Sequence, residues 1–415
     1  MHNNSKNLTK SKPKSSIITK IAMTMIIVAA ITTTITTIMI DNPFTNIQVA
    51  YAHFHLPPNC STCLGGQGDD TLTGTNTGYL SSNNIYGDAY PSLPTGTQGG
   101  NDQLTGGDNS NNFMAGEAYQ MSSSTGGDDQ LTGGGGYNSY NSMIGDAAEM
   151  FSSTGGDDQL TGGDNSILNA MFGDANTMDS STGGDDQLKG GDNSNNNYMV
   201  GDAGTMTSST GGDDRLTGGE DNNIYNEMYG DANTMIDSQG GDDILIGGTG
   251  EIYMYGDAAL MDNSRGGDDI LFAGTGTNYM FGDAEPRYTS TTSSGGNDKL
   301  ITTTGGQGST YELTGGGGED LFVTGGNTDP NVITITDYTP GEDRIAGALA
   351  KDYRTATLST NSGNEQVPIK TQLNNLLLQE KVQKTPTTTT TTNANEQQQI
   401  EGQLNAILLK GNGKK

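Results

Sequence analysis

The chain has 415 residues, of which only 31% are hydrophobic, and it contains 63 glycines and no tryptophan. This composition argues against a conventional globular core and leaves either disorder or a narrow solenoid core as the alternatives. The formal net charge of −30 argues against nucleic acid as a partner, and bound multivalent cations would relieve the repulsion among the acids.

The first 52 residues are predicted to be a signal peptide or an N-terminal anchor. Basic residues such as Lys14 and Lys20 precede an apolar, threonine-rich run from Ile21 to Ile40, and Ala50-Tyr51-Ala52 fits the small-x-small cleavage rule. The run is also long enough to span a bilayer, so an uncleaved anchor is the alternative, and only then would the chain contact a membrane. Both interpretations predict a secreted, extracellular or cell-surface protein.

Residues 53–64 form a short segment rich in cysteine and histidine. Cys60 and Cys63 form a C-x-x-C pair, and His53 and His55 lie just before it. Export favours a disulfide, idle thiols are a second interpretation, and a small metal site is a third. The sequence leaves this choice open.

From residue 65 onward two short motifs alternate. Gly-Gly-(Asp/Asn)-Asp recurs every 26 to 29 residues, and Gly-Asp-Ala recurs between its copies, with Gly116-Glu117-Ala118 as a variant. A fixed period of this kind is typical of a solenoid. Each motif is associated with an x-apolar-x triplet, in which the middle side chain points to one face of a strand and its neighbours to the other.

The triplets predict two parallel sheets that enclose a thin core. Leucines such as Leu131 would stack in one ladder, methionines such as Met143 would stack opposite, and glycines would permit the sharp turns. A second methionine series lies three residues after Gly-(Asp/Glu)-Ala, and its loops are expected to stack as a satellite ladder. Its members are Met121, Met150, Met178, Met206, Met235 and Met261.

The repeats resemble the RTX, or haemolysin-type, calcium-binding family, whose nonapeptide is Gly-Gly-x-Gly-x-Asp-x-apolar-x. Two stretches match it fully, Gly65 to Thr73 and Gly315 to Val323, and Ile335 to Ile345 resembles the family's terminal segment. The resemblance implies an all-β parallel β-roll, or β-solenoid, over residues 65–325 with a terminal cap at 326–346. It also implies Ca²⁺ as the bound ion, held by the turns. Inside the array the turns are longer than in the family, so we expect a roll with expanded turns.

Ca²⁺ takes six to eight oxygen ligands, and a glycine-rich turn with one aspartate offers both backbone carbonyls and a carboxylate. We therefore predict a column of calcium ligands shared between adjacent turns. Its members are Gly66, Gly68, Asp70, Asp102, Asp129, Asp158, Asp186, Asp214, Asp243, Asp269, Asp298, Gly316, Gly318 and Asp320.

The Gly-Asp-Ala carboxylates are a second potential column, with local capping of their own turns as the alternative role. The turn before the methionine strands carries asparagine instead of aspartate, so calcium there should be weak or absent.

Aromatic residues flank the methionine column and are expected to point outward. The members of this group are Tyr86, Phe113, Phe172, Tyr198, Tyr229, Tyr253, Tyr255, Tyr279 and Phe281. Such a face would contact glycans, a cell envelope or another copy of the chain, whereas coverage by another segment is the alternative.

Residues 347–415 are predicted to be a flexible, threonine-rich tail with two helical patterns, near Leu376 and between Asn393 and Lys410. The chain has no G-x-S-x-G or H-E-x-x-H motif. We therefore expect a calcium-binding protein with an adhesive or structural role and no catalytic activity. A β-helical polysaccharide lyase or epimerase is the alternative.

Overall fold

The computed structural model describes residues 62–76, 82–221, 224–286, 289–290, 292–302, 308–325 and 332–347. These residues form 28 β-strands, and no helix long and apolar enough to cross a bilayer occurs among them. The predicted signal or anchor, His53, His55, Cys60 and the tail lie outside these ranges. Cys63 is disulfide-bonded, and the chain has only one other cysteine.

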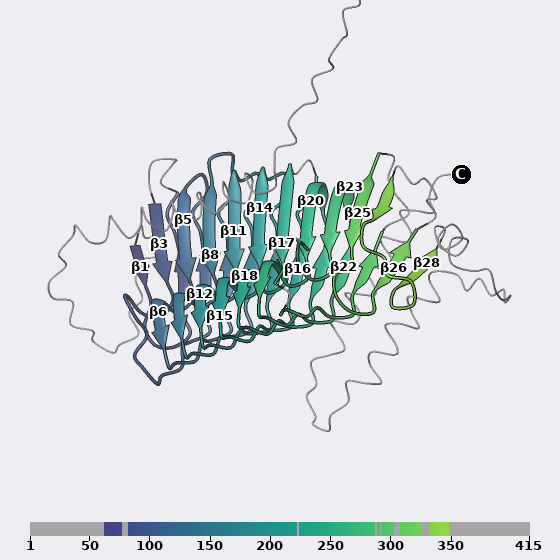
Figure 1. The fold of residues 1–415 in the computed structure, drawn as a ribbon. Coiled ribbons are helices and arrows are strands. Elements are labelled where there is room, and N and C mark those ends of the chain that lie inside the picture. The colour runs from purple at the N-terminus through teal and green to yellow at the C-terminus, as the bar shows by residue number, and fades with distance from the viewer. Residues whose placement is uncertain are drawn as a thin grey trace, which may run out of the picture. The chain divides into compact units, whose positions relative to one another are not determined.

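Two parallel sheets of 11 strands run along the solenoid (Figure 1). The first, which we call the methionine sheet, contains β1 (Thr62–Leu64), β3 (Ser82–Tyr86), β5 (Asn111–Ala115), β8 (Tyr140–Ile144), β11 (Leu168–Phe172), β14 (Asn196–Val200), β17 (Tyr225–Tyr229), β20 (Thr249–Tyr255), β23 (Thr275–Phe281), β25 (Thr310–Thr314) and β27 (Ile333–Ile335). The second, the leucine sheet, contains β2 (Thr71–Thr73), β4 (Gln103–Thr105), β7 (Gln130–Thr132), β10 (Gln159–Thr161), β13 (Gln187–Lys189), β16 (Arg215–Thr217), β19 (Ile244–Ile246), β22 (Ile270–Phe272), β24 (Lys299–Ile301), β26 (Leu321–Thr324) and β28 (Arg344–Gly347).

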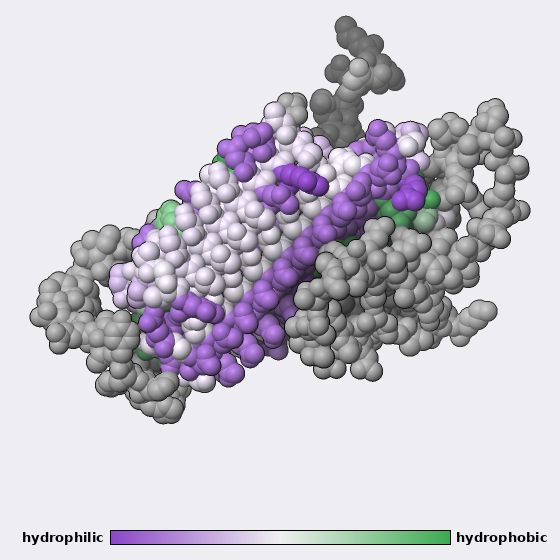
Figure 2. All heavy atoms as spheres, turned by 90° about the horizontal axis from the view of Figure 1, so that it is seen from below, coloured by the Kyte–Doolittle hydropathy of each residue, from purple (hydrophilic) through white to green (hydrophobic). Residues whose placement is uncertain are grey.

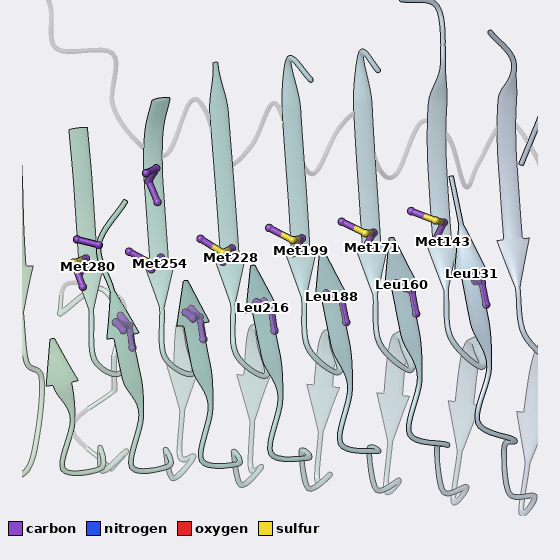
Figure 3. Close-up of a cluster of buried hydrophobic side chains, with 14 of the residues drawn as sticks. Leu131, Met143, Leu160, Met171, Leu188, Met199, Leu216, Met228, Met254 and Met280 are labelled. Carbon is purple, nitrogen blue, oxygen red and sulfur yellow. The ribbon is translucent and has the colours of Figure 1, made fainter. Parts of the chain in front are cut away.

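The core between these sheets is a double ladder of side chains. Met171 pairs in register with Met143 and Met199, and Leu160 pairs with Leu188 in the facing sheet. All of these side chains belong to one buried cluster, which Figure 3 shows as a methionine row above a leucine row. The predicted parallel β-solenoid, with one apolar ladder on each sheet, is therefore confirmed.

A third parallel sheet of six strands lies where the sequence predicted stacked loops. It contains β6 (Ala118–Ser122), β9 (Ala147–Phe151), β12 (Ala175–Asp179), β15 (Ala203–Thr207), β18 (Ala232–Ile236) and β21 (Ala258–Asp262). The predicted satellite methionine ladder is present: Met150, Met178 and their equivalents form a separate buried cluster with the alanines of the Gly-Asp-Ala motifs. The stacking prediction was correct, but the regular strands were not foreseen.

The aromatic face is not exposed, so that prediction is wrong, and the alternative, coverage by another segment of the chain, is correct. Tyr229 and Tyr255 have no exposed surface, and Tyr198 is only 4% exposed. These rings lie on the face of the methionine sheet opposite its methionines, and the third sheet packs against that face. The Tyr198 side chain hydrogen-bonds Asn233 of β18, and a Cβ at Gly204 of β15 would lie 3.4 Å from the Phe172 ring.

The aromatic residues therefore bind the third sheet to the methionine sheet. Tyr229, Tyr255 and Phe281 form a continuous stack, with ring centroids 4.8 Å apart in both pairs and ring planes within 6° of parallel. Such stacks add to the stability that burial of the rings provides.

Buried asparagines form a third ladder, at the start of the methionine strands. The Nδ2 group of Asn141 donates to Oδ1 of Asn169 at 2.8 Å, and Asn169 donates in the same way to Asn197. Each asparagine also bonds a neighbouring turn: Oδ1 of Asn169 accepts from the backbone N–H of Gly163 at 3.0 Å. The asparagine column therefore links the turns that precede the methionine strands by hydrogen bonds.

Replacement of one asparagine in this ladder should be costly. Asn169→Leu removes the acceptor for both Asn141 and Gly163, and an unpaired buried donor costs about 1–3 kcal/mol. We expect a loss of about 2–5 kcal/mol in the free energy of unfolding, measured by urea titration. The control is Asn195→Leu, the same change at an exposed position, which should shift stability by less than about 0.5 kcal/mol. Equal stability of the two variants would show that the asparagine ladder does not contribute to the free energy of unfolding.

Candidate functional site: two columns of buried carboxylates

The third sheet brings the two sequence motifs together in every coil. The chain leaves the methionine sheet at Gly145-Asp146, runs along β9, and returns at Gly155 to Asp158 before it enters β10. The outgoing and returning segments touch: the backbone N–H of Gly156 lies 3.3 and 3.2 Å from the two carboxyl oxygens of Asp146. We call this junction between the third sheet and the main core the neck.

Two columns of acids line the neck. The entry column precedes the leucine strands and contains Asp70, Asp102, Asp129, Asp158, Asp186, Asp214, Asp243, Asp269, Asp298, Asp320 and Asp343. The corner column follows the methionine strands and contains Asp88, Glu117, Asp146, Asp174, Asp202, Asp231, Asp257 and Asp283. All of them are buried except Asp70, which is half-buried.

One oxygen of each entry acid after Asp70 is held by the backbone of the preceding coil. The N–H of Asp158 donates to Oδ1 of Asp186 at 2.7 Å, and the same bond recurs in unbroken sequence from Asp70 to Asp343 with lengths from 2.6 to 3.1 Å. The predicted aspartates thus do form one column. Asp343 was missed because it lies in the terminal segment, although Gly341-Glu342-Asp343 repeats the same spacing of glycine and acid.

The other oxygen of the entry acids has no protein partner. Oδ2 is buried and unbonded in eight of them, Asp102, Asp129, Asp158, Asp186, Asp214, Asp243, Asp269 and Asp298. Each lies against the glycine of a corner motif: a Cβ at Gly173 would overlap Oδ2 of Asp186 and also the backbone oxygen of Gly201 in the next coil. A carboxylate oxygen and a backbone carbonyl of the neighbouring coil therefore flank the same point.

The corner acids reach across the neck in the opposite direction. Asp174 accepts from the backbone N–H of Gly184 at 3.0 Å, and equivalent bonds of 2.5 to 3.3 Å occur from Asp88 to Asp283. In most coils the corner carboxylate precedes the glycine that donates to it by ten residues. This bond is therefore not the local capping of its own turn that was the alternative role for the Gly-Asp-Ala carboxylates. Each acid fits the space that a glycine of the opposite motif leaves open, which explains why both motifs pair glycine with a carboxylate.

Corner acids of consecutive coils also contact one another. A Cβ at Gly155 would contact Oδ1 of Asp174 and, at 2.6 Å, Oδ2 of Asp146, and a Cβ at Gly183 would contact Oδ1 of Asp202 and, at 2.6 Å, Oδ2 of Asp174. Two carboxylates in such contact need a shared proton or a cation between them. Their second oxygens are otherwise unbonded in Asp174, Asp202, Asp231 and Asp257 and in Glu117, where the atom is Oε2.

Burial raises the pKa of these carboxyls, and their mutual repulsion adds to the effect. Burial is the main reason why the pKa of Asp186 is well above its usual range, and repulsion from Asp174, Asp158 and Asp214 raises it further. Burial also raises the pKa of Asp174 to about 7, although hydrogen bonds from its neighbours oppose the rise. The neck cannot hold all its carboxylates ionised without positive charge beside them.

Three of the four predicted glycine ligands, Gly66, Gly68 and Gly316, present their N–H groups to acids. The N–H of Gly68 donates to Oδ1 of Asp88 at 3.2 Å, and the N–H of Gly66 donates to Oδ2 of Asp70 at 2.7 Å. Gly316 and Gly318 have φ angles of 106° and 130°, which favour glycine. Gly316 donates to Asp337 at 2.8 Å. Their role as calcium ligands stays a prediction.

A second row of acids is exposed beside the entry column, and it contains Asp128, Asp157, Asp185, Asp213, Asp242 and Asp268. Each accepts a backbone N–H from the following coil, as Asp157 does from Asp185 at 3.1 Å. A continuous hydrophilic band runs along the solenoid in Figure 2. These side chains are solvated, in contrast to the buried acids next to them.

No three described His, Cys, Asp or Glu side chains converge closely enough to hold a metal ion alone. An ion in the neck would therefore be held by one or two carboxylates together with backbone carbonyls and water, a ligand set that Ca²⁺ accepts. Comparison with family models, curated proteins and solved structures finds no match to this chain. The resemblance to RTX repeats thus depends on the motif residues alone.

Proposed function

We propose that this protein binds Ca²⁺ along the entry column and that ion binding is coupled to folding of the solenoid. The observation that supports this most directly is the set of eight buried Oδ2 atoms without a partner. Buried polar atoms normally have a partner, so a repeated exception at equivalent positions indicates that an absent ion or proton completes each of them.

The chemistry of the neck favours a hard cation. Each free oxygen lies close to a backbone carbonyl of the next coil, as Oδ2 of Asp186 does to the Gly201 oxygen, and the corner acids add further charge. Calcium tolerates irregular coordination and binds extracellular modules at about 10⁻⁴ to 10⁻³ M. The export signal expected from the first 52 residues would place the chain where calcium reaches such concentrations.

We infer that the solenoid with bound Ca²⁺ has a structural or adhesive role outside the cell. Because the aromatic rings are buried, attachment to glycans, the envelope or another copy would use other surfaces. The alternative, a β-helical lyase or epimerase acting on polysaccharides, predicts turnover of an acidic polysaccharide by the purified protein. Incubation with such a polymer, followed by chromatography of the products, tests it directly.

Calcium should convert the full-length protein from coil to β-structure. We expect circular dichroism to show coil in chelator and a β spectrum after addition of about 1 mM Ca²⁺, with heat released on titration. Asp186→Asn should weaken binding, because it removes the charge at an unpaired oxygen, whereas Asp185→Asn, one residue away and exposed, should not.

The proposal fails if the chelated protein keeps the same β spectrum and takes up no calcium. An equal response to Mg²⁺ alone would contradict selectivity for calcium. Equal weakening by Asp185→Asn and Asp186→Asn would show that general charge, and not the buried column, controls the effect.

A further inference from the structure

We propose that the corner column holds its own row of divalent cations, one between the carboxylates of each two consecutive coils. This row is distinct from the entry column. The inference rests on the proposed function for the identity of the ion, but its evidence comes from different residues.

The first argument is geometric. Neighbouring parallel strands lie about 4.8 Å apart, so equivalent corner acids repeat at that spacing. The side chains approach one another more closely than this spacing. A Cβ added to Gly183 would meet both Oδ1 of Asp202 and Oδ2 of Asp174. The same arrangement recurs beside Gly211, where Oδ1 of Asp231 meets Oδ2 of Asp202. Two carboxylate oxygens from consecutive coils meet in this way in five intervals, beside Gly99, Gly155, Gly183, Gly211 and Gly240.

The two oxygens of a corner acid differ in their partners. Oδ1 of Asp202 accepts the N–H of Gly212 at 2.8 Å, and Oδ1 of Asp231 accepts that of Gly241 at 2.7 Å. Oδ2 has no such donor in either residue, and both residues have no exposed surface. The backbone positions the carboxylate through one oxygen and leaves the other directed at the next coil.

The third argument separates this row from the entry column. The free oxygen of an entry acid lies over the corner glycine, as Asp186 does over Gly173. The free oxygen of a corner acid lies over the first glycine of Gly-Gly-Asp-Asp, as Asp174 does over Gly183. The two sets of oxygens therefore lie against different glycines of the neck, and a substitution can remove the carboxylates of one set while those of the other remain.

Divalent oxygen-seeking cations suit this row best. Each interval offers two hard carboxylate oxygens in a buried setting, and the entry acids beside them add further negative charge, as Asp186 does beside Asp174. A proton shared between each pair of corner acids is the alternative occupant. The experiment below distinguishes these two states by counting ions.

The test measures bound calcium per folded chain after equilibrium dialysis, with atomic emission for the ion and circular dichroism for the fold. The corner variant is Asp202→Asn with Asp231→Asn, which keeps an oxygen acceptor for Gly212 and Gly241 and removes both charges. It disables three intervals, so we expect about three fewer ions than in the wild type. The exposed pair Asp213→Asn with Asp242→Asn is the matched control and should bind the wild-type number.

A corner variant that folds and binds as many ions as the wild type overturns this inference and assigns shared protons to the column. If Asp214→Asn in the entry column nevertheless lowers the count, the proposed function stands without the second row. If the wild type binds no calcium, both proposals fall. Should the double variant not fold in saturating calcium, the single change Asp257→Asn, nearer the end of the column, provides the same comparison with about two fewer ions expected.

Discussion

Without divalent cations, the solenoid should be most stable below about pH 4 and should lose that stability progressively as the pH rises from about 4 to about 8. Burial raises the pKa of Asp88 to about 6, those of Asp174 and Asp283 to about 7, and that of Asp102 to about 8. In the unfolded chain these carboxyls titrate near 3.9. The folded state therefore binds more protons than the unfolded state throughout this window.

The sign follows from proton linkage. A carboxyl whose pKa is raised by folding contributes its full stabilisation below its unfolded pKa, because it is then neutral in both states. That contribution is lost as the pH rises through the folded pKa, when an ionised carboxylate becomes buried. One pKa unit corresponds to about 1.4 kcal/mol, so a fully buried group such as Asp174 changes stability by a few kcal/mol across the range.

The measurement is urea unfolding in chelator, followed by circular dichroism from about pH 4 up to the pH at which the chelated protein is already coil. We expect the midpoint to fall steadily with pH and Asp174→Asn to reduce the slope. Asp185→Asn should leave the slope unchanged, because Asp185 is exposed. A midpoint that rises with pH in chelator would contradict buried neutral acids and would require them to be paired with positive charge from the protein.

Calcium should remove this pH dependence at neutral pH and above. Metal ligands must be deprotonated, so calcium competes with protons and its apparent affinity should rise with pH. Acid and calcium thus become alternative ways to satisfy the same oxygens. If calcium binds as proposed, this competition would account for the burial of two columns of carboxylates in a chain with a net charge of −30.

The two main sheets could be predicted because their residues obey a strict rule. Each x-apolar-x triplet lies between glycine-rich turns, and a period close to 28 residues brings Leu160 beside Leu188 and Met171 beside Met199. Alternation along a strand then determines which side chain enters the core. No other information was needed to place these ladders.

The third sheet escaped prediction because its strands do not alternate. Ala175 and Met178 are both buried in its core although they are three residues apart, and the pairing of β12 with β15 joins Ala175 to Ala203 and Thr177 to Thr205 but leaves out Asn176. A search for period two therefore finds a methionine but no strand.

The error about the aromatic rings follows from the missing sheet. The alternation correctly placed Tyr229 and Tyr255 on the side opposite the methionines. Only the third sheet, which covers that side, makes them buried. A sequence pattern gives the direction of a side chain, whereas its exposure depends on what packs there.

The candidate site was predictable by residue type but not by arrangement. Fixed spacing placed the entry acids in one column, and that column exists. The contact between the entry acids and the corner glycines could not be predicted from the sequence. It forms only because the chain returns from the third sheet to the same corner that it left. The free oxygens become visible only when every backbone donor in the neck has been assigned.

Gly173→Ala should destabilise the protein by more than about 3 kcal/mol, even though alanine is the smallest possible addition. The new methyl group would overlap Oδ2 of Asp186 and the backbone oxygen of Gly201. The carboxylate cannot swing away freely, because its Oδ1 is bonded to the Asp158 N–H at 2.7 Å. The carbonyl cannot move without separation of two coils that are paired along their length.

The same substitution should also reduce calcium binding, because the methyl group occupies the point that the free oxygen of Asp186 and the Gly201 carbonyl flank. A purely structural glycine would cost stability but would leave the ion count per folded chain unchanged. Measurement of both quantities on Gly173→Ala at saturating calcium therefore separates a tight backbone contact from a ligand site.

Gly66→Ala is the matched control, since a Cβ at Gly66 meets nothing within 4 Å. Its φ angle is not among the positive ones, so alanine is compatible with the backbone there. This variant should be as stable as the wild type or more stable by up to about 1 kcal/mol, because alanine restricts the unfolded chain. The reciprocal fit of glycine and carboxylate across the neck would be wrong if Gly173→Ala matched Gly66→Ala in urea midpoint and matched the wild type in bound calcium. A wider neck could then accept the methyl group.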